Sequence, residues 1–247
     1  MTHTHFVGLD VGQSQDPTAI AVVEVAVWLS EAWAFELAAP ASGWVWPGDL
    51  VPAQVDQARS LNQHRGRPPD PPLAVRHLER LPLGTPYPAV VERVQRLLAT
   101  PPLRPETTVL IVDKTGVGAP IVDLLKTPTF WPVACTITAG STPTFEAGGW
   151  EVHVPKRDLI SSMAVLLENR RLKVADTLPE AATLVKELQA FRRRITPVGS
   201  DQYGSWREGQ HDDLVLALAL ACWYREDRNS LIEQRNRDDY RPESRAG

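Results

Sequence analysis

Cysteine is scarce in this sequence and long apolar runs are missing, and these two absences exclude several classes of protein. Its two cysteines, Cys135 and Cys222, match no metal-binding spacing, so we expect reduced, buried thiols in a cytoplasmic protein. The longest apolar run, Leu214 to Tyr224, is well short of the ~20 residues that a membrane span requires. The first residues, Met1 to His5, are polar and contain no Lys or Arg, so no signal peptide is expected.

An excess of positive charge and a phosphate-binding loop are also missing. The chain has 26 Lys and Arg against 30 Asp and Glu, a formal net charge of -4. Any contact with nucleic acid must therefore use a local basic face. Lys114 and Lys126 are each followed by Thr but lack the glycine spacing of a P-loop, so no ATP-driven motor is expected within this chain.

The distribution of apolar residues and prolines predicts one α/β domain. With 247 residues, 43% of them hydrophobic, the chain can bury one sizeable core. Residues 1–228 form the predicted domain, with a Pro-rich insertion at about 40–72, and residues 229–247 form a charged, flexible tail. Period-2 and continuous apolar runs predict strands at residues 6–10, 18–28, 33–37, 73–81, 107–113, 133–138 and 150–154. Helical spacing predicts helices at residues 88–98, 119–126, 156–169, 179–194 and 212 to about 228. The strands at 6–10, 18–28 and 33–37 have short links, which suggests an antiparallel meander. Alternating strands and helices after it favour a central mixed sheet with helices on both faces.

Three aspartates stand where secondary structure changes. Asp10 and Asp113 end the short apolar runs that predict buried strands, and Asp213 opens the apolar run that predicts a buried helix. Side chains placed in this way can meet at one edge of a sheet. Converging carboxylates repel one another and are costly to desolvate, so they usually bind a metal. We therefore expect a Mg²⁺ or Mn²⁺ site, with two ions that clamp a phosphodiester between them.

Each aspartate also has a structural interpretation. Asp10 and Asp113 could cap the turn or helix that follows them, and Asp212 could cap the helix that Asp213 opens. Asp212 therefore remains either a cap or a further metal ligand. The string Asp113-Lys114-Thr115-Gly116 also resembles the phosphorylated motif of P-type ion pumps, but Val117 departs from that motif and the chain has no membrane span.

Residues near the aspartates could assist them. His211 could orient a water or contact phosphate, Asp16 could add an outer carboxylate, and Lys114 lies beside Asp113. Basic residues in the C-terminal half could bind DNA phosphates without regard to sequence. This set comprises Lys156, Arg157, Arg170, Arg171, Lys173, Arg192, Arg193 and Arg194.

The order of these segments resembles the nuclease domain of phage terminase large subunits. Gly8-Leu9-Asp10-Val11-Gly12, continued by Asp16-Pro17-Thr18, is similar to the opening of that domain. Val112-Asp113-Lys114-Thr115-Gly116 is similar to its second acidic segment, and His211-Asp212-Asp213-Leu214-Val215 to its closing motif. Lys156–Ile160 and Arg171–Val174 resemble its later helix and strand.

The resemblance implies an RNase H-like fold, with a three-strand antiparallel meander followed by parallel strands. It implies Mg²⁺- or Mn²⁺-dependent cutting of double-stranded DNA during genome packaging, with Asp10, Asp113 and Asp213 as catalytic carboxylates. The ATPase part that usually accompanies this domain is missing from the sequence, so we expect a separate packaging ATPase, a portal or a small terminase subunit as partners. The expected location is the cytoplasm of a bacterial host that carries the phage or prophage.

Three other functions compete with this one. A junction-resolving nuclease would have the same fold and prefer four-way DNA junctions. A phosphotransferase of the actin and sugar-kinase fold would need a second Gly-rich phosphate loop, which His211-Asp212-Asp213 does not offer. A metal-free DNA-binding or scaffold module would have carboxylates that do not converge.

Overall fold

A computed structural model describes residues 2–12, 16–27, 71–103, 107–146, 150–194 and 211–239. Of residue 2 and of residues 191–194 and 228–239 it describes the backbone only. The predicted strand at 33–37 and nearly all of the Pro-rich insertion lie outside these ranges. Within them, no helix combines the length and the apolar composition that crossing a membrane would take.

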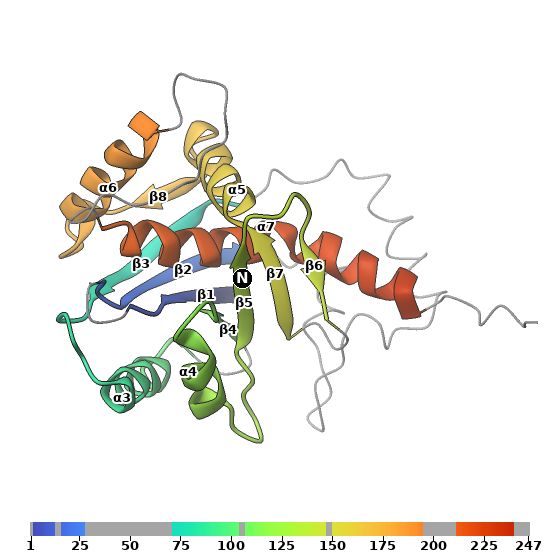
Figure 1. Cartoon of the computed structure of the whole chain (residues 1–247). Coiled ribbons are helices and arrows are strands. Elements are labelled where there is room, and N and C mark those ends of the chain that lie inside the picture. The colour runs from blue at the N-terminus through green and yellow to red at the C-terminus, as the bar shows by residue number, and fades with distance from the viewer. Residues whose placement is uncertain are drawn as a thin grey trace, which may run out of the picture.

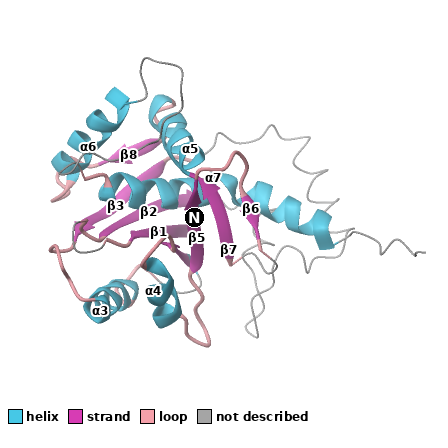
Figure 2. Cartoon of the chain, in the orientation of Figure 1, coloured by secondary structure: helices cyan, strands magenta, loops and turns pink. Residues whose placement is uncertain are grey.

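One mixed sheet organises the domain (Figure 2). It has eight strands in the order β6-β7-β5-β4-β1-β2-β3-β8. The strands are β1 (Thr2–Asp10), β2 (Ala19–Val27), β3 (Leu73–Arg80), β4 (Thr108–Asp113), β5 (Val133–Thr138), β6 (Thr144–Phe145), β7 (Glu151–Pro155) and β8 (Leu172–Val174). The short edge strand β6 falls where the sequence predicted only a Gly-rich link. Both edge strands are short, which limits pairing with other chains.

The sheet confirms the predicted fold class. Strands β1, β2 and β3 form an antiparallel meander, while β4 pairs with β1 and β5 pairs with β4 in parallel. The third meander strand is Leu73–Arg80, which follows the insertion in sequence, and the predicted third strand at 33–37 lies outside the described residues. This meander followed by parallel strands is the arrangement that the RNase H-like resemblance implies.

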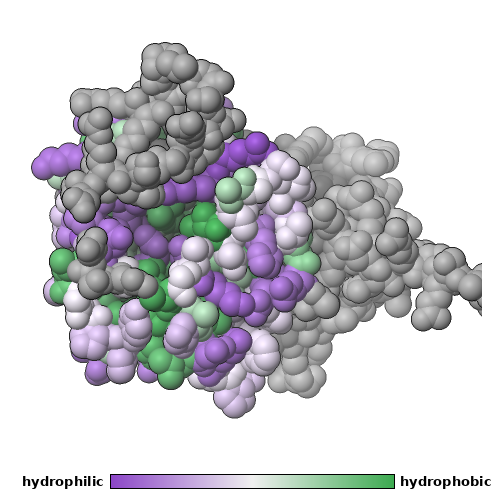
Figure 3. Space-filling view, in the orientation of Figure 1, coloured by the Kyte–Doolittle hydropathy of each residue, from purple (hydrophilic) through white to green (hydrophobic). Residues whose placement is uncertain are grey.

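Helices cover both faces of the sheet, as predicted (Figure 1). Helices α3 (Tyr87–Leu98) and α4 (Gly118–Leu125) pack on one face, where branched residues of the helices meet Val7 and Leu9 of β1. Helices α5 (Lys156–Glu168), α6 (Ala181–Arg194) and α7 (Asp213–Asp239) pack on the other. On the face that Figure 3 shows, hydrophobic residues gather in the lower part of the view, around α3 and α4.

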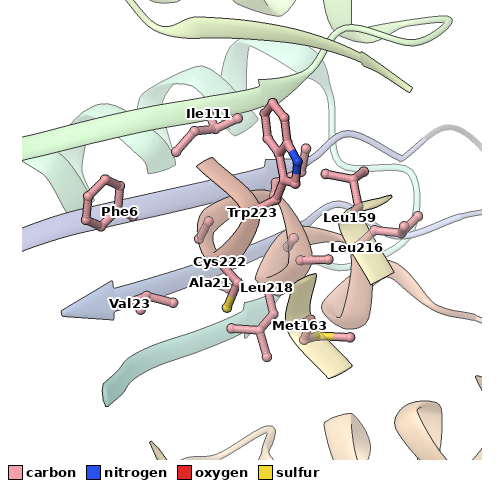
Figure 4. Close-up of a cluster of buried hydrophobic side chains, with 14 of the residues drawn as sticks. Phe6, Ala21, Val23, Ile111, Leu159, Met163, Leu216, Leu218, Cys222 and Trp223 are labelled. Atoms are coloured by element: carbon pink, nitrogen blue, oxygen red, sulfur yellow. The ribbon is translucent and has the colours of Figure 1, made fainter. Parts of the chain in front are cut away.

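Helix α7 forms the centre of the larger core. Its residues from Leu214 to Trp223 are buried on every side, and Figure 4 shows Leu218, Cys222 and Trp223 among the side chains of β1, β2 and α5. The helix continues to Asp239, beyond the predicted end near Arg228. The added residues are mostly charged or polar residues with good helix propensity, which a search for apolar periodicity does not register.

Candidate metal centre

Helix α7 lies directly on the backbone of β1 because Gly8 has no side chain. A Cβ atom at Gly8 would lie 1.8 Å from the carbonyl oxygen of Ala217, so no larger residue fits there without displacing the helix. Later in the helix but earlier in the strand, the rings of Tyr224 and Phe6 are 6.4 Å apart between centroids. The helix therefore runs antiparallel to the strand, and its N-terminus lies over the carboxyl end of β1.

The carboxyl ends of β1 and β4 carry two buried aspartates. Leu9 is paired in register with Val112, so Asp10 and Asp113, the last residues of β1 and β4, lie next to each other at the same edge of the sheet. Because side chains alternate along a strand, Asp10 shares the α7 face with Gly8, and Asp113 shares it with Ile111. Each aspartate is only 8% exposed. Both carboxylates thus point toward the N-terminus of α7.

The electrostatics of Asp10 show that the predicted aspartates lie together. Burial raises the pKa of Asp10 well above its usual range, and the charges of Asp113, Asp213 and Asp212 raise it further. The charge of Lys156 acts in the opposite direction. The structure therefore brings all four predicted carboxylates to one edge, where ionising them together is costly.

The loop after β4 holds Asp113 in place. The Thr115 N–H donates to Oδ1 of Asp113 at 2.8 Å. Burial raises the pKa of Asp113, while the hydrogen bonds from Thr115 and the charge of Lys156 lower it. Lys114 extends to Glu151, with 2.5 Å between Nζ and Oε2, so the cation beside Asp113 in sequence is paired elsewhere.

Asp212 and Asp213 have different partners. The Asp212 carbonyl accepts the Leu216 N–H at 2.9 Å, which makes Asp212 the residue that precedes α7, and its Oδ2 lies 3.3 Å from Nζ of Lys156. Asp213, the first residue of α7, is 3% exposed, and its Oδ2 lies 3.3 Å from a guanidinium nitrogen of Arg80. Burial raises the pKa of Asp213, whereas Arg80 and His211 lower it.

Arg80 and Glu187 belong to the site although no motif indicated them. Ala19 pairs with Asp10 on one side and with Arg80 on the other, so Arg80 ends β3 at the same edge of the sheet. The guanidinium of Arg80 donates to Oε1 of Glu187, and Oε2 of Glu187 accepts the Val215 N–H at 3.2 Å. Burial raises the pKa of Glu187 to about 7 despite the Arg80 charge. Glu187 thus caps α7, and Arg80 joins that cap to Asp213.

Asp10 was identified because it stands at the end of a predicted strand, and the same criterion could have identified Arg80. The third strand of an antiparallel meander ends at the same edge as the first. Glu187 gave no comparable signal, because it is an ordinary polar residue within a predicted helix and lies 107 residues from Arg80 in sequence.

His211 brings Asp16 and Asp213 together. Its Nδ1 lies 3.8 Å from Oδ1 of Asp16 and 3.8 Å from Oδ2 of Asp213. One potential ligand atom from each of these three residues lies within 4.8 Å of the other two. Among the described residues, no group that combines Asp10, Asp113 and Asp213 is equally compact.

Close packing against Gly12 positions Asp16 in this group. The Gly12 N–H donates to Oγ1 of Thr18 at 3.1 Å, and a Cβ at Gly12 would lie 1.9 Å from the Asp16 carbonyl oxygen. Gly8 and Gly12 flank Asp10, and both positions admit closely packed protein backbone, that of α7 at Gly8 and that of Asp16 and Pro17 at Gly12.

The predicted DNA-binding residues are in several different environments. Arg157 donates to the Ser141 carbonyl at 2.5 Å, and Arg171 makes a two-point ion pair with Glu226 at 2.7 and 3.0 Å. Arg170 and Lys173 are exposed. Arg192, Arg193 and Arg194 end α6, and their side chains lie outside the described part. Among the members whose side chains the structure describes, Lys156 is the one that contacts the carboxylate cluster, through Asp212. The DNA-binding role of every member of the set stays a prediction.

Comparisons with known proteins give a likeness of fold. The chain is similar to the crystal structure of the large terminase nuclease from thermophilic phage G20c, at 20% identity over 91% of this chain and 82% of that chain, with a TM-score of 0.46. A second structure of that nuclease, with bound magnesium, gives 21% identity, 89% and 80% coverage, and a TM-score of 0.44. No protein-family model and no curated protein sequence match the chain. The similarity of this chain to the large terminase nuclease is therefore one of overall architecture at low sequence identity.

Proposed function

We propose that this chain is a metal-dependent endonuclease that cleaves double-stranded DNA. The observation that carries the proposal is the convergence of buried Asp10, Asp113 and Asp213 at one sheet edge, where burial and mutual repulsion raise the pKa of Asp10. Buried carboxylates without enough cations to neutralise them are the donors that Mg²⁺ and Mn²⁺ prefer.

The existing ion pairs distinguish ligands from supporting residues. Lys156 pairs with Asp212, and Arg80 pairs with both Glu187 and Asp213. Two cations cannot neutralise all five acidic side chains at this edge, and within the described part of the chain Asp10 and Asp113 have no ion pair with either of them. Oδ2 of Asp213 is also buried without a hydrogen-bond partner in the described structure. These three aspartates would therefore hold the metal, and Asp212 would orient Lys156.

The chain's own residues restrict the chemistry. A metal at this edge would activate a water and neutralise charge on the phosphate. No cysteine is placed to act as the nucleophile, because Cys135 and Cys222 are buried and burial raises the pKa of both thiols. The charge of Lys156 acts on both Asp10 and Asp113. Lys156 is therefore the cation that we propose lies beside the substrate.

The DNA substrate and the setting are parts of the proposal that rest on the sequence. The segment order resembles that of the terminase nuclease, which supports double-stranded DNA as substrate and phage genome packaging in a bacterial host as the role. A packaging ATPase, a portal or a small terminase subunit would be the partners.

A plasmid-nicking assay in Mn²⁺ tests the activity. We expect the wild-type chain to convert supercoiled plasmid to nicked and linear forms. Asp10→Asn and Asp113→Asn should each reduce the rate by at least about 1000-fold, because each removes a metal ligand but keeps the shape of the side chain.

Asp123→Asn is the matched control. Asp123 lies on α4 with its side chain 75% exposed, so this variant should cleave at the wild-type rate. Equal cleavage by wild type, Asp10→Asn and Asp113→Asn would refute the proposal. A four-way junction offered beside plain duplex separates the two nuclease candidates, because a resolvase would cut the junction preferentially.

A further inference from the structure

The segment that joins β3 to α3 borders an open hollow at the carboxyl edge of the sheet. Figure 1 shows this segment between the end of β3 and the start of α3. The hollow has a volume of about 260 Å³. Gly12, Asp16 and Thr18 line one side of it, and residues of the segment Pro82–Tyr87 line the other. The hollow therefore lies at the same edge as the converging aspartates.

The hollow begins next to the proposed metal site. Asp16 lines it, and Oδ1 of Asp16 lies 3.8 Å from Nδ1 of His211, which is 3.8 Å from Oδ2 of Asp213. The segment that borders the hollow follows Arg80, whose guanidinium lies 3.3 Å from the same Oδ2 of Asp213. A group bound in the hollow would therefore lie close to the phosphodiester that the aspartates are proposed to cleave.

Hydrogen bonds fix the walls of the hollow in advance. The Leu81 N–H donates to the Thr18 carbonyl at 2.8 Å, which ties the segment to the start of β2. The N–H and the hydroxyl of Thr85 both donate to the Pro82 carbonyl, at 3.1 and 2.5 Å. Tyr87 packs against the core beneath α3 and α4. Because the walls are already ordered, a ligand that enters has little conformational entropy to remove.

The chemistry of the lining suits a flat, neutral ring that carries N–H donors. The Tyr87 ring offers a face for stacking, and the Asp16 carboxylate, with its side chain 69% exposed, can accept hydrogen bonds. Among the described residues that line the hollow there is no Lys or Arg, so a phosphate would meet only the repulsion of Asp16. A nucleobase has a π-face and at least one N–H donor on its pairing edge, which matches this lining.

An exposed leucine stands beside the hollow. Leu83 is 57% exposed, between Pro82 and Gly84, which both line the hollow. Gly84 has a φ of +77°, a left-handed conformation that glycine adopts without strain. Apolar side chains held in this way can enter a base stack and fill the place of a base that has left it. Leu83 is therefore placed to stabilise an opened duplex next to the hollow.

We propose that this hollow binds a nucleobase that leaves the DNA duplex beside the cleaved phosphodiester. Tyr87 would stack on the base, Asp16 would accept its N–H groups, and Leu83 would support the stack that remains. The inference deepens the proposed function, because it names the part of the DNA that enters next to the metal site. A paired, stacked base cannot reach a hollow, so the cost of extruding it would become part of the cost of cleavage.

Cleavage of a duplex with one mismatched base pair, compared with the same duplex fully paired, tests the inference. The full wild-type chain in Mn²⁺ should cut next to the mismatch at least about tenfold faster, because a mismatched base is easier to extrude. Tyr87→Ala should lose most of this preference, whereas Tyr87→Phe keeps the ring and should retain it. Equal cutting of the two duplexes by the wild type would overturn the inference.

Leu83→Ala gives a second variant that does not depend on the packing of Tyr87. Leu83 is exposed, so the change should leave the fold intact and lower the mismatch preference at least about threefold. Leu124→Ala is the matched control, because Leu124 is 54% exposed on α4 and should keep the full preference. A preference that persists in both Tyr87→Ala and Leu83→Ala would also overturn the inference.

These outcomes can be separated from those of the proposed function. If the wild type cuts both duplexes equally, the nuclease proposal stands and the base-binding hollow is wrong. If it cuts neither, fluorescence anisotropy of the labelled duplexes decides. Tighter binding of the mismatched duplex that Tyr87→Ala abolishes and Tyr87→Phe retains would support the hollow although the nuclease proposal fails. Equal binding of both duplexes would refute the hollow as well.

Discussion

The two ends of the neighbouring strands β1 and β4 are both buried, yet they differ in charge. At the amino end of the stretch in which the two strands pair, His5 and Thr108 are in register, are 2% and 5% exposed, and have side-chain atoms without hydrogen-bond partners in the described structure. At the carboxyl ends, Asp10 and Asp113 are also buried. Burial lowers the pKa of His5 and favours its neutral form, whereas several like charges meet around Asp10. A buried polar group without a hydrogen bond therefore does not by itself indicate a functional site. The convergence of several like charges does.

Breaking the close contact between α7 and β1 should have the largest effect on the difference between the two strand ends. Gly8→Ala would place a Cβ 1.8 Å from the Ala217 carbonyl oxygen, so the helix must move off β1 and carry Asp213 away from Asp10. We expect the free energy of unfolding to fall by about 3 kcal/mol or more, measured by urea denaturation. Gly140→Ala is the control, because its Cβ would meet only a side-chain hydroxyl at 3.3 Å. Equal stability of both variants would show that α7 does not sit on Gly8.

Arg80→Ala should have the next largest effect, on the carboxyl end alone. It leaves buried Glu187 and Asp213 without their shared cation, and we expect a loss of about 2 kcal/mol at pH 8 in chelator. The loss should shrink at pH 5, where Glu187, with a pKa of about 7, is protonated. Arg93→Ala removes a more exposed pair with Glu79 and should lose less than about 1 kcal/mol. Urea denaturation at both pH values measures this, and a loss independent of pH would argue against the Arg80–Glu187 pairing.

The pH dependence of stability should be determined by the buried acidic residues at the carboxyl ends of the strands. The pKa values of Asp10, Asp113, Asp213 and Glu187 are all raised in the folded protein, so the folded state binds these protons more tightly than the unfolded state. Their contribution is fully present below the ordinary pKa values near 4 and is lost as pH rises toward about 7. Thermal melts in chelator should therefore show a lower melting temperature at pH 8 than at pH 5. Excess Mn²⁺ should restore it at pH 8, and a melting temperature that rises with pH in chelator would contradict this account.

His5→Leu, at the amino end, should have the smallest effect. It replaces a neutral buried ring without hydrogen bonds by an apolar side chain, so stability should change by no more than about 1 kcal/mol. Plasmid nicking should continue at the wild-type rate. A severe loss of cleavage would show that the two ends of the strands are coupled.

The sequence predicted much of the fold because apolar runs end where the strands end. Asp10 and Asp113 each close such a run, and the carboxyl ends of parallel strands share an edge. The all-apolar run after Asp213 predicted a buried helix, which α7 confirms. The strand at Leu73–Arg80 was also predicted, but its place as the third strand of the meander depends on pairing across the long insertion.

The rest of the site depends on contacts that no local pattern encodes. Arg80 and Glu187 meet because β3 and α6 happen to flank the N-terminus of α7, far apart in sequence. The compact group of Asp16, His211 and Asp213 depends on the packing of Asp16 and Pro17 against Gly12. The sequence indicates Asp16 and His211 as auxiliary residues, but no local pattern shows that both face Asp213.

Crystals of the chain soaked in Mn²⁺ and measured at the manganese absorption edge test the central claim most directly. The account predicts an anomalous peak between Asp10, Asp113 and Asp213, at the carboxyl edge of β1 and β4. A well-ordered edge without any manganese peak at saturating Mn²⁺, or a peak bound only elsewhere on the chain, would contradict it.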